Sequence, residues 1–388
     1  MKLGSRSDIE WVSEEQAQFF ASVLEFSRTL PRAGMIERDR SNTFSWDAWK
    51  RCGEFGIQGL PAAEEYGGGG ADTVTTMLAL EALGYGCVDN GLVFAINAHM
   101  WTSVIPLGDH GTEEQRRRWL PGLCSGQLVG CHAITEPDAG SDPFAMTTSA
   151  RRTTDGYVLN GRKTFISNAP IADLMIVFAR TSEGLGPYGI TAFLVERGTP
   201  GCSTTREIEK MGLRTSPMSE IVLDGCFVDD AAILGRRGRG AEVFQRSMMW
   251  ERACIMASQV GMMRRTMDRC IAFAQERRQF GQAIGKFGSV ADKIANMKIA
   301  VDAARGLILR VGWIMDRGED AQLEAAVAKA FVSEASVRTH LDAVQIHGGY
   351  GYTTEFEIER SLRDALGGTI YSGTSEIQRR IIATRLGL

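Results

Sequence analysis

Two kinds of hydrophobic spacing follow one another along this chain, and their order limits the folds that it can adopt. Residues 8 to about 124 have apolar positions at helical spacing, as in 17–26. Residues 125 to about 235 change to short β-rich runs between turn signals, and helical patterns return from Ala241 onward. We therefore predict an α+β protein. Its expected parts are an N-terminal helical domain (1–124), a middle β-domain (125–235) and a C-terminal helix-bundle domain (236–388).

The middle region carries the signals of a small all-β domain. The dipeptides Asp-Gly at 155–156 and Asn-Gly at 160–161 flank the run 157–159, and both favour the tight turns of a meander. Five or more short strands in about 110 residues predict a small barrel or a sandwich. The other strands are expected at 128–134, 174–178, 190–195 and 220–223.

Long helical patterns fill the last part of the chain. Residues 241–279 contain no proline, and 290–315 and 321–346 are two further long helix candidates. Long neighbouring helices of this kind predict a helix bundle.

Composition narrows the class of protein. Lys and Arg total 43 against 47 for Asp and Glu, so no basic surplus is available for a nucleic-acid backbone. The apolar run 174–179 is far shorter than the ~20 residues that span a bilayer, and the first eight residues contain no apolar signal core. We therefore expect a cytoplasmic protein with neither a nucleic-acid nor a membrane partner.

Several common catalytic and metal-binding motifs are missing from the sequence. The eight cysteines are scattered without a C-x-x-C pair, which predicts reduced and mostly buried thiols. The five histidines lack H-E-x-x-H spacing, so no metal site is expected. A G-x-G-x-x-G turn after a strand, a Walker A sequence and a G-x-S-x-G elbow are also missing.

Three segments occur in a characteristic order. Residues 131–142 read C-H-A-I-T-E-P-D-A-G-S-D, and 276–285 read E-R-R-Q-F-G-Q-A-I-G. The third begins with Q-I-H-G-G-Y-G-Y at 345–352 and continues to I-Y-S-G-T-S-E-I-Q at 370–378. Together with N-G-R-K-T-F-I-S-N at 160–168, they resemble the acyl-CoA dehydrogenase family over almost the whole chain.

This resemblance implies an FAD enzyme with a C-terminal four-helix bundle after the helical and β-domains. In the family, FAD lies between the β-domain and the C-terminal helices, and a neighbouring subunit completes the site. A homotetramer or homodimer is therefore expected, with an electron-transfer flavoprotein as electron acceptor.

Matching to the family assigns a set of FAD-binding residues. Small residues let the backbone approach a flat ring and an anionic linker, and an arginine suits the pyrophosphate. Family members often have Trp at Phe165 and Gln at Gly288, so this chain has a smaller stacking surface and one amide contact fewer. The assigned residues are Ile134, Thr135, Gly140, Ser141, Phe165, Ser167, Arg277, Phe280, Gln345, Gly348, Gly349, Thr374 and Glu376.

The family reaction needs a carboxylate that removes the proton α to a thioester carbonyl. Many members place this Glu directly before Gly-Thr, where this chain has Ser372, and a serine hydroxyl is too weak a base without an activating partner. Isovaleryl-type members carry the base on a C-terminal-domain helix before an Arg, which matches Glu251 and Arg252. Glu251 is therefore the candidate base.

The helical surroundings of Glu251 support the same assignment. Its neighbours on one helix face are Phe244, Met248, Cys254 and Ile255. A carboxylate on an apolar face is expected to be partly desolvated, which raises its pKa. The alternative is a structural ion pair of Glu251 with Arg252 or Arg246.

Substrate contacts are expected from Ser141, Arg252 and Gly373, with the thioester carbonyl held by a backbone N–H and a flavin hydroxyl. The thioester belongs to CoA or to a carrier protein, and the sequence fixes neither this choice nor the acyl chain. Two other functions stay open: a flavin oxidase or monooxygenase on the same scaffold, and a non-catalytic flavin-binding protein that lost its base at Ser372.

Overall fold

The N-terminal part is helical, as predicted, in the computed structural model, which describes residues 12–182 and 186–388. The residues of the predicted signal-free N-terminus lie outside the described residues. The first helix begins at a capping box, in which Ser13 and Gln16 exchange side-chain and backbone hydrogen bonds. The helices are α1 (Glu14–Arg28), α2 (Met35–Ser41), α3 (Trp46–Phe55), α4 (Thr73–Gly86), α5 (Asn90–His99), α6 (Ile105–His110) and α7 (Glu113–Cys124), with short turns η1 (Glu64–Tyr66) and η2 (Met100–Val104).

One continuous helical stretch runs through α5, η2 and α6. This stretch, Asn90–His110, is by length and composition apolar enough to cross a membrane. It is longer than 174–179, the apolar run on which the sequence analysis relied. However, 89% of its apolar window is buried inside the fold. The stretch is therefore accounted for as a core helix.

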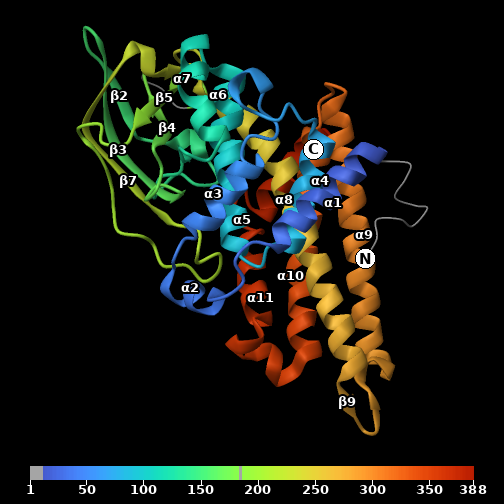
Figure 1. The fold of residues 1–388 in the computed structure, drawn as a ribbon. Helices are drawn as coiled ribbons and strands as arrows, with labels where there is room; N and C mark the ends of the chain where they lie inside the picture. Colours follow the sequence, from blue (N-terminus) through green and yellow to red (C-terminus); the bar gives the residue numbers. More distant parts are fainter. Residues whose placement is uncertain (1–11, 183–185) are drawn as a thin grey trace.

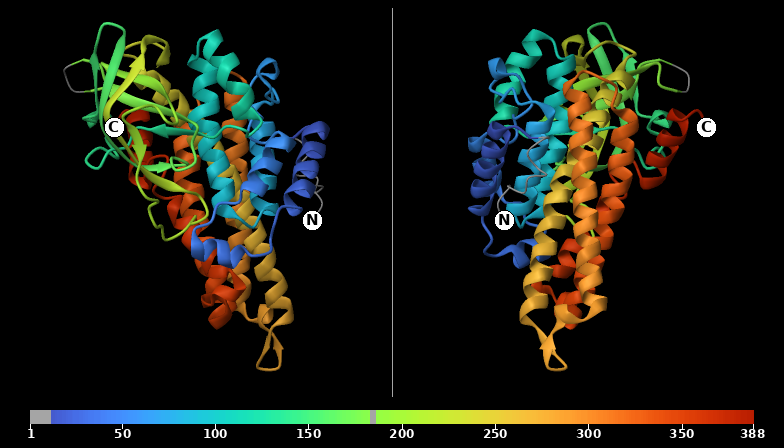
Figure 2. Two further views of the ribbon diagram at one scale, coloured as in Figure 1. Left: turned by 60° about the vertical axis from the view of Figure 1, so that its left-hand side comes forward. Right: turned by 90° about the vertical axis from the view of Figure 1, so that its right-hand side faces the viewer.

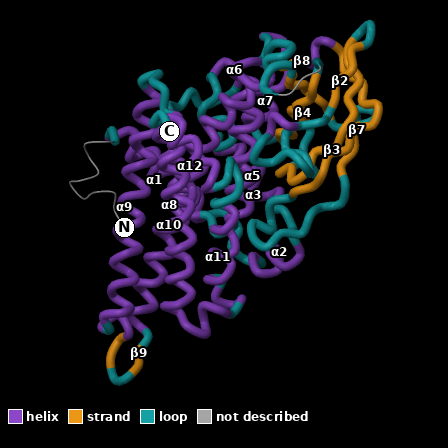
Figure 3. Tube along the Cα trace, turned by 180° about the vertical axis from the view of Figure 1, so that it is seen from behind, coloured by secondary structure: helices purple, strands orange, loops and turns teal. Residues whose placement is uncertain are grey.

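The strands of the middle part form one mixed sheet in the order β6-β7-β3-β2-β4-β5-β8, with β1 paired to β4 (Figure 1). β1 and β2 run parallel to β4, and the other pairs are antiparallel. Helices and strands occupy different sides of the molecule (Figure 3). The strands are β1 (Gly130–Ala133), β2 (Ser149–Arg152), β3 (Gly156–Ser167), β4 (Leu174–Arg180), β5 (Ile190–Glu196), β6 (Cys202–Thr204), β7 (Met218–Asp229) and β8 (Ile233–Leu234), with short turns η3 (Pro143–Ala145) and η4 (Asp230–Ala232).

The turn predicted at 160–161 is wrong, whereas the one at 155–156 links β2 to β3. Strand β3 continues through Asn160 and Gly161 to Ser167, because the equally long β7 pairs with it on both sides of this dipeptide. The register shifts between Leu159 and Gly161. The glycine therefore serves a β-bulge in a long strand instead of a hairpin turn.

The three long helices of the C-terminal part run side by side, with the β9–β10 hairpin at one end, and two shorter helices follow them (Figure 2). The helix predicted from Ala241 is α8, and the next two predictions correspond to α9 and α10. The elements are α8 (Gly240–Glu276), β9 (Arg278–Gln279), β10 (Gln282–Ala283), η5 (Ile284–Lys286), α9 (Gly288–Asp316), α10 (Gln322–His347), η6 (Gly348–Tyr352), η7 (Thr354–Phe356), α11 (Ile358–Gly367) and α12 (Ser375–Arg385).

Helix α8 also packs closely against α4, which joins the N-terminal helices to the bundle. Gly84 on α4 and Gly261 on α8 lie at this crossing. A side chain at Gly84 would collide with the carbonyl oxygen of Ser258, and one at Gly261 with that of Glu81. The two backbones can approach so closely only because both positions are glycine.

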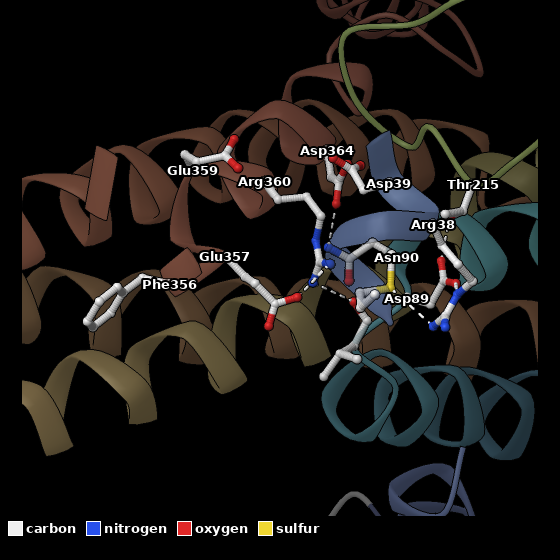
Figure 4. A network of polar contacts seen from close by, with 12 residues as sticks. Arg38, Asp39, Asp89, Asn90, Thr215, Phe356, Glu357, Glu359, Arg360 and Asp364 are labelled. Atoms are coloured by element: carbon white, nitrogen blue, oxygen red, sulfur yellow. Dashed lines mark hydrogen bonds and ion pairs between the residues drawn. The ribbon is translucent and has the colours of Figure 1, made fainter. Parts of the chain in front are cut away.

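A buried polar network connects all three parts of the chain (Figure 4). The carboxylate of Asp364 on α11 accepts hydrogen bonds from the Asn90 side chain at 2.8 Å and from the Leu213 amide at 2.6 Å. Thr215 donates to Asp89 at 2.5 Å. Since these residues come from the helical domain, the β-domain and the C-terminal part, the network fixes how the parts sit together.

Candidate active site

Glu251 lies on α8 with 7% of its surface exposed. Burial raises the pKa of its carboxyl, and the Ser372 hydroxyl, Arg252 and Lys329 act in the opposite direction. The desolvation predicted from the apolar helix face is thus confirmed. The alternative ion pair is not formed among the described residues, since Arg246 pairs with Asp109 and Arg252 binds a backbone carbonyl.

The serine at the usual position of the family base contacts Glu251 directly. The Ser372 hydroxyl donates a hydrogen bond to Oε1 of Glu251 at 2.7 Å. The two places where the family carries its base, on the long helix and before Gly-Thr, therefore meet at one point in this fold.

The turn that carries Ser372 is held from three helices. Nε of Arg252 on α8 donates to the Ser372 carbonyl at 3.3 Å, and Nε2 of Gln378 on α12 does so at 3.1 Å. Nζ of Lys329 on α10 donates to the Gly373 carbonyl at 2.6 Å. Burial lowers the pKa of Lys329 to about 8.

Aromatic residues directly precede both Glu251 and Ser372 in the chain, and each packs against a ring of the N-terminal part. Trp250 stacks on Trp101 with ring centroids 5.9 Å apart, and Tyr371 packs against Phe94 at 4.8 Å. The Tyr371 hydroxyl accepts a hydrogen bond from Gln259 at 3.0 Å. The Tyr371 hydroxyl next to the base thus has a partner, whereas the buried indole N–H of Trp250 has none among the described residues.

A cavity of about 490 Å³ adjoins this region and brings the predicted substrate residues Ser141 and Arg252 together. Met248 and Arg252, on either side of Glu251 along α8, both line it. Its rim carries Arg380 on α12, which is exposed and has no ion pair within residues 12–182 and 186–388. The cavity thus combines apolar walls with a cationic rim.

The predicted FAD residues of the β-domain lie on the loop after β1 and on β3. Ile134 is buried, Thr135 is half-buried, and Gly140 and Ser141 are exposed, with open space where a Gly140 side chain would be. A fully buried lysine fixes this loop, because Nζ of Lys163 donates to the Ile134 carbonyl at 3.1 Å and to Glu136 at 2.8 Å.

Glu136 completes the support of this loop. Its oxygens accept the amides of Thr147 at 2.6 Å and Thr148 at 2.9 Å. Burial acts to raise the pKa of Glu136, but Lys163 and these hydrogen bonds outweigh it and lower the pKa to about 2. Burial also lowers the pKa of Lys163 to about 8.

Phe165 presents an aromatic ring to the surface. It exposes 61% of its area and adopts φ 56°, a left-handed conformation that is unfavourable for a bulky residue. Ser167, two residues further along β3, is half-buried. An exposed ring beside an open glycine loop fits a planar aromatic cofactor that would cover it.

The residues of the last motif lie at the start of α12. Thr374 caps this helix by accepting the Ile377 amide at 3.3 Å, and Gly373 has φ 87°. Glu376 is exposed in the first turn, and a hydrogen bond from its own backbone lowers the pKa of its carboxyl.

The other predicted FAD residues gather at the far end of the bundle. Arg277, Gly348 and Gly349 line a second cavity of about 420 Å³, and Arg277 lies over the Tyr350 ring at 5.6 Å. Gln345 lies nearby in the last turn of α10, and its carbonyl accepts the Gly348 amide. Phe280, which is 93% exposed, lies between β9 and β10. This end lies away from the sheet in Figures 1 and 3, so one chain does not bring the two groups together.

Both groups nevertheless suit parts of FAD. The β-domain group offers an exposed ring and small residues, and the bundle-end group offers an arginine beside Gly348 and Gly349, where an added side chain would meet no atom within 4 Å. An arginine with open backbone fits an anionic diphosphate.

Four supporting residues were missed in the sequence: Glu136, Lys163, Lys329 and Gln378. Glu136, Lys163 and Gln378 lie inside the segments that carry the resemblance. The signal that could have found the first pair is the opposite charge of Glu136 and Lys163, which lie in two of these segments. Lys329 sits within an ordinary helical pattern and gives no such signal.

The cysteines and the other potential metal ligands are spread over the three parts of the chain. All eight thiols are free, and all but Cys202 are buried, as predicted. Within residues 12–182 and 186–388, no group of three or more His, Cys, Asp or Glu side chains is arranged to hold a metal ion.

Comparison with known proteins identifies the family. "Acyl-CoA dehydrogenase, N-terminal domain" matches residues 13–127, the middle domain of the same family matches 131–226, and its C-terminal domain matches 238–387. The chain therefore belongs to the acyl-CoA dehydrogenase family.

Individual relatives show where the chain lies within this family. It is 43% identical over 351 residues to the L-prolyl-[peptidyl-carrier protein] dehydrogenase of Pseudomonas fluorescens, covering 90% of this chain and 92% of that protein. It is 36% identical to the mitochondrial isovaleryl-CoA dehydrogenase of Oryza sativa subsp. japonica, covering 96% and 91%. The crystal structure of the prolyl acyl carrier protein oxidase AnaB has a TM-score of 0.95 and 45% identity, covering 97% of this chain and 100% of that one.

Proposed function

We propose that this chain oxidises a small acyl group held as a thioester on a carrier protein, with Glu251 as the catalytic base. The coarser activity, FAD-dependent α,β-dehydrogenation of an acyl thioester, follows from its membership of the acyl-CoA dehydrogenase family. The observation that carries the assignment of the base is a buried carboxylate that forms no ion pair with the described residues and is hydrogen-bonded to the serine at the alternative base position.

In this mechanism Glu251 removes the proton from the carbon α to the thioester carbonyl. FAD, when bound, supplies the acceptor for the hydride that leaves the β-carbon. Low solvent exposure raises the pKa of the carboxyl and so strengthens the carboxylate as a base. The Ser372 amide N–H makes no hydrogen bond among the described residues and is available to the thioester carbonyl.

We propose that FAD is held by the β-domain group of one chain and the bundle-end group of another. Ile134, Thr135, Gly140, Ser141, Phe165 and Ser167 would contact the flavin part, with Thr374 and Glu376 beside it. Arg277, Phe280, Gln345, Gly348 and Gly349 would contact the nucleotide part of a cofactor in a neighbouring copy. The separation of the two groups within one chain supports a homodimer or homotetramer.

The 490 Å³ cavity supports a path for the pantetheine arm, which CoA and carrier proteins share. Ser141 and Arg252, which line the cavity, would contact the arm, and Arg380 at the rim suits its phosphate. Gly373 does not line the cavity and would contact the substrate beside Ser372. Relatives named for prolyl groups on carrier proteins, including AnaB at 45% identity, favour the carrier and a prolyl-sized substrate.

We also propose three domains for the chain, a cytoplasmic location and an external electron acceptor. The domain boundaries at 124/125 and 235/236 lie at the end of α7 and between β8 and α8. A cytoplasmic location and an electron-transfer flavoprotein as acceptor stay predictions.

A second candidate is an oxidase that passes its electrons to oxygen. The oxidase AnaB, with 45% identity and a TM-score of 0.95, favours it. Stoichiometric peroxide formed during turnover in air would support the oxidase, and turnover that needs an added electron acceptor would support the dehydrogenase.

The substrate proposal is tested by presenting matched prolyl, isovaleryl and butyryl thioesters to the anaerobic FAD-loaded protein. Each acyl group is offered both on a carrier protein and on CoA, and bleaching of the flavin is followed together with the product mass. Faster bleaching with a carrier-bound acyl group, prolyl above the others, is expected. Equal or faster reduction by the CoA esters would contradict the carrier assignment.

A further inference from the structure

We propose that Ser372 is a positioning residue for Glu251: its hydroxyl holds Oε1 of the carboxylate and leaves Oε2 to take the substrate proton. This inference rests on the proposed function, since it requires Glu251 to be the base.

The two carboxylate oxygens of Glu251 are in different situations. Oε1 accepts the Ser372 hydroxyl at 2.7 Å, whereas Oε2 accepts no hydrogen bond from the part of the chain that the structure describes. The nearest cations are turned to other acceptors: Arg252 to the Ser372 carbonyl and Lys329 to the Gly373 carbonyl. One held oxygen fixes the rotation of the carboxylate, so the direction of the free oxygen is fixed as well.

The donor itself is held in an unusual backbone conformation. Ser372 has φ 57°, which costs a residue with a side chain roughly 1 kcal/mol. Its carbonyl is bound by Arg252 from α8 and Gln378 from α12. The surrounding helices thus hold a strained turn whose hydroxyl points at the base, and strain of this kind is characteristic of functional sites.

The hydrogen bond also favours the charged form of the base. Burial raises the pKa of Glu251, and a donor to the carboxylate opposes this effect together with the charges of Arg252 and Lys329. Tyr371 faces the same carboxylate, and burial raises the pKa of its hydroxyl, so this group stays neutral. Ser372 therefore helps Glu251 to be ionised although its carboxylate is buried.

Three variants separate this role from a structural one. Ser372→Ala removes the donor but requires the same left-handed backbone as serine. Ser372→Asn keeps a donor and tolerates that conformation. Ser258→Ala is the matched control, because Ser258 is also buried, lies on α8 and donates only to the Ile255 carbonyl at 2.8 Å.

The main measurement is the pH dependence of anaerobic flavin reduction by the acyl thioester. In Ser372→Ala the acidic limb of the flavin-reduction rate is expected to move up by about one pH unit, because a hydrogen bond to a charged group is worth about that much. Below the wild-type midpoint this rate falls roughly tenfold, and the thioester concentration that gives half of the maximal rate changes less. Ser372→Asn recovers most of the rate, and Ser258→Ala follows the wild-type profile.

A second measurement does not depend on turnover. The infrared carbonyl band of protonated Glu251, identified by its loss in Glu251→Gln, is expected to persist to higher pH in Ser372→Ala. The inference is overturned if Ser372→Ala has the acidic limb of the pH profile and the infrared carbonyl band of the wild type. The proposed function still stands in that case, provided that Glu251→Gln is inactive. If Glu251→Gln is reduced as fast as the wild type, the proposed function itself fails.

Discussion

Ser372 and Glu251 are 121 positions apart in the sequence, yet the serine hydroxyl lies 2.7 Å from Oε1 of the glutamate. One residue stands where many members of the family carry the base, and the other stands where isovaleryl-type members carry it. Their contact shows that side chains at both positions reach the same point in space. A carboxylate on α8 can therefore reach the site that a carboxylate before Gly-Thr would occupy.

Reversing the charge at the rim of the substrate cavity is expected to weaken substrate binding. Arg380→Glu replaces a cation that forms no ion pair with the described residues by an anion, where the phosphate of the pantetheine arm is proposed to bind. KM for the carrier-bound thioester should rise about tenfold at low salt, and less at high salt because surface charges are screened. Steady-state kinetics at two ionic strengths measure this effect.

Arg379→Glu provides the control, since the charge change is the same but Arg379 pairs with Glu334 and does not line the cavity. An equal increase of KM in both variants would show that the net charge of the surface, and not the rim of the cavity, is responsible.

Removing the buried lysine that holds the loop after β1, where FAD is proposed to bind, should reduce both stability and FAD binding. Lys163→Met leaves Glu136 buried without its cation, which typically costs about 3 kcal/mol. The free energy of unfolding is measured by denaturant titration, and FAD affinity by fluorescence. Arg162→Met, one residue away, removes an exposed guanidinium from its pair with the half-buried Glu220 and should cost less, at about 1 kcal/mol. Similar losses in both variants would argue against a special role of Lys163.

The same pair gives a pH dependence of stability. The pKa of Glu136 is about 2 in the folded protein, below its ordinary value of 4.5. Its contribution is therefore complete above pH 4.5 and is lost as the pH falls towards 2. Glu136→Gln should lower stability at neutral pH and flatten the decline between pH 4.5 and 2. An unchanged slope in that window would contradict the assignment.

The crossing of α4 and α8 predicts a glycine-specific effect. Gly261→Ala places a methyl group against the backbone of Glu81 and Tyr85, and we expect it to destabilise the fold by about 2 kcal/mol. Gly306→Ala on α9 meets no atom within 4 Å and should be neutral or stabilising, because alanine is the better helix former. Thermal unfolding of the two variants compares them, and equal midpoints would show that the crossing can relax.

Local patterns predicted the long helices well, because α8, α9 and α10 are proline-free and their spacing is regular. The Asn-Gly dipeptide at 160–161 misled the prediction for a tertiary reason. The partner strand β7 is long enough to pair on both sides, so a bulge replaces the turn. The apolar stretch Asn90–His110 shows the same limit, since only packing reveals it as a core helix.

In the candidate site, too, local features were predicted from the sequence and long-range contacts were not. The apolar neighbours of Glu251 on its own helix were enough to predict burial and a raised pKa, because that information is local. The partner of its carboxylate is not local, and no spacing rule connects Ser372 to α8. The support that Lys163 gives to the loop after β1 was missed because a lysine on a strand is normally solvent-exposed.

The central claim is that Glu251 removes the α-proton, and anaerobic flavin reduction in Glu251→Gln tests it most directly. The variant keeps the size of the side chain and a carbonyl oxygen that can accept the Ser372 hydrogen bond, so FAD binding and folding should be retained. We expect the rate of flavin bleaching by the acyl thioester to fall by roughly 10²–10⁴-fold. Reduction of the FAD-loaded variant at the wild-type rate would contradict the account.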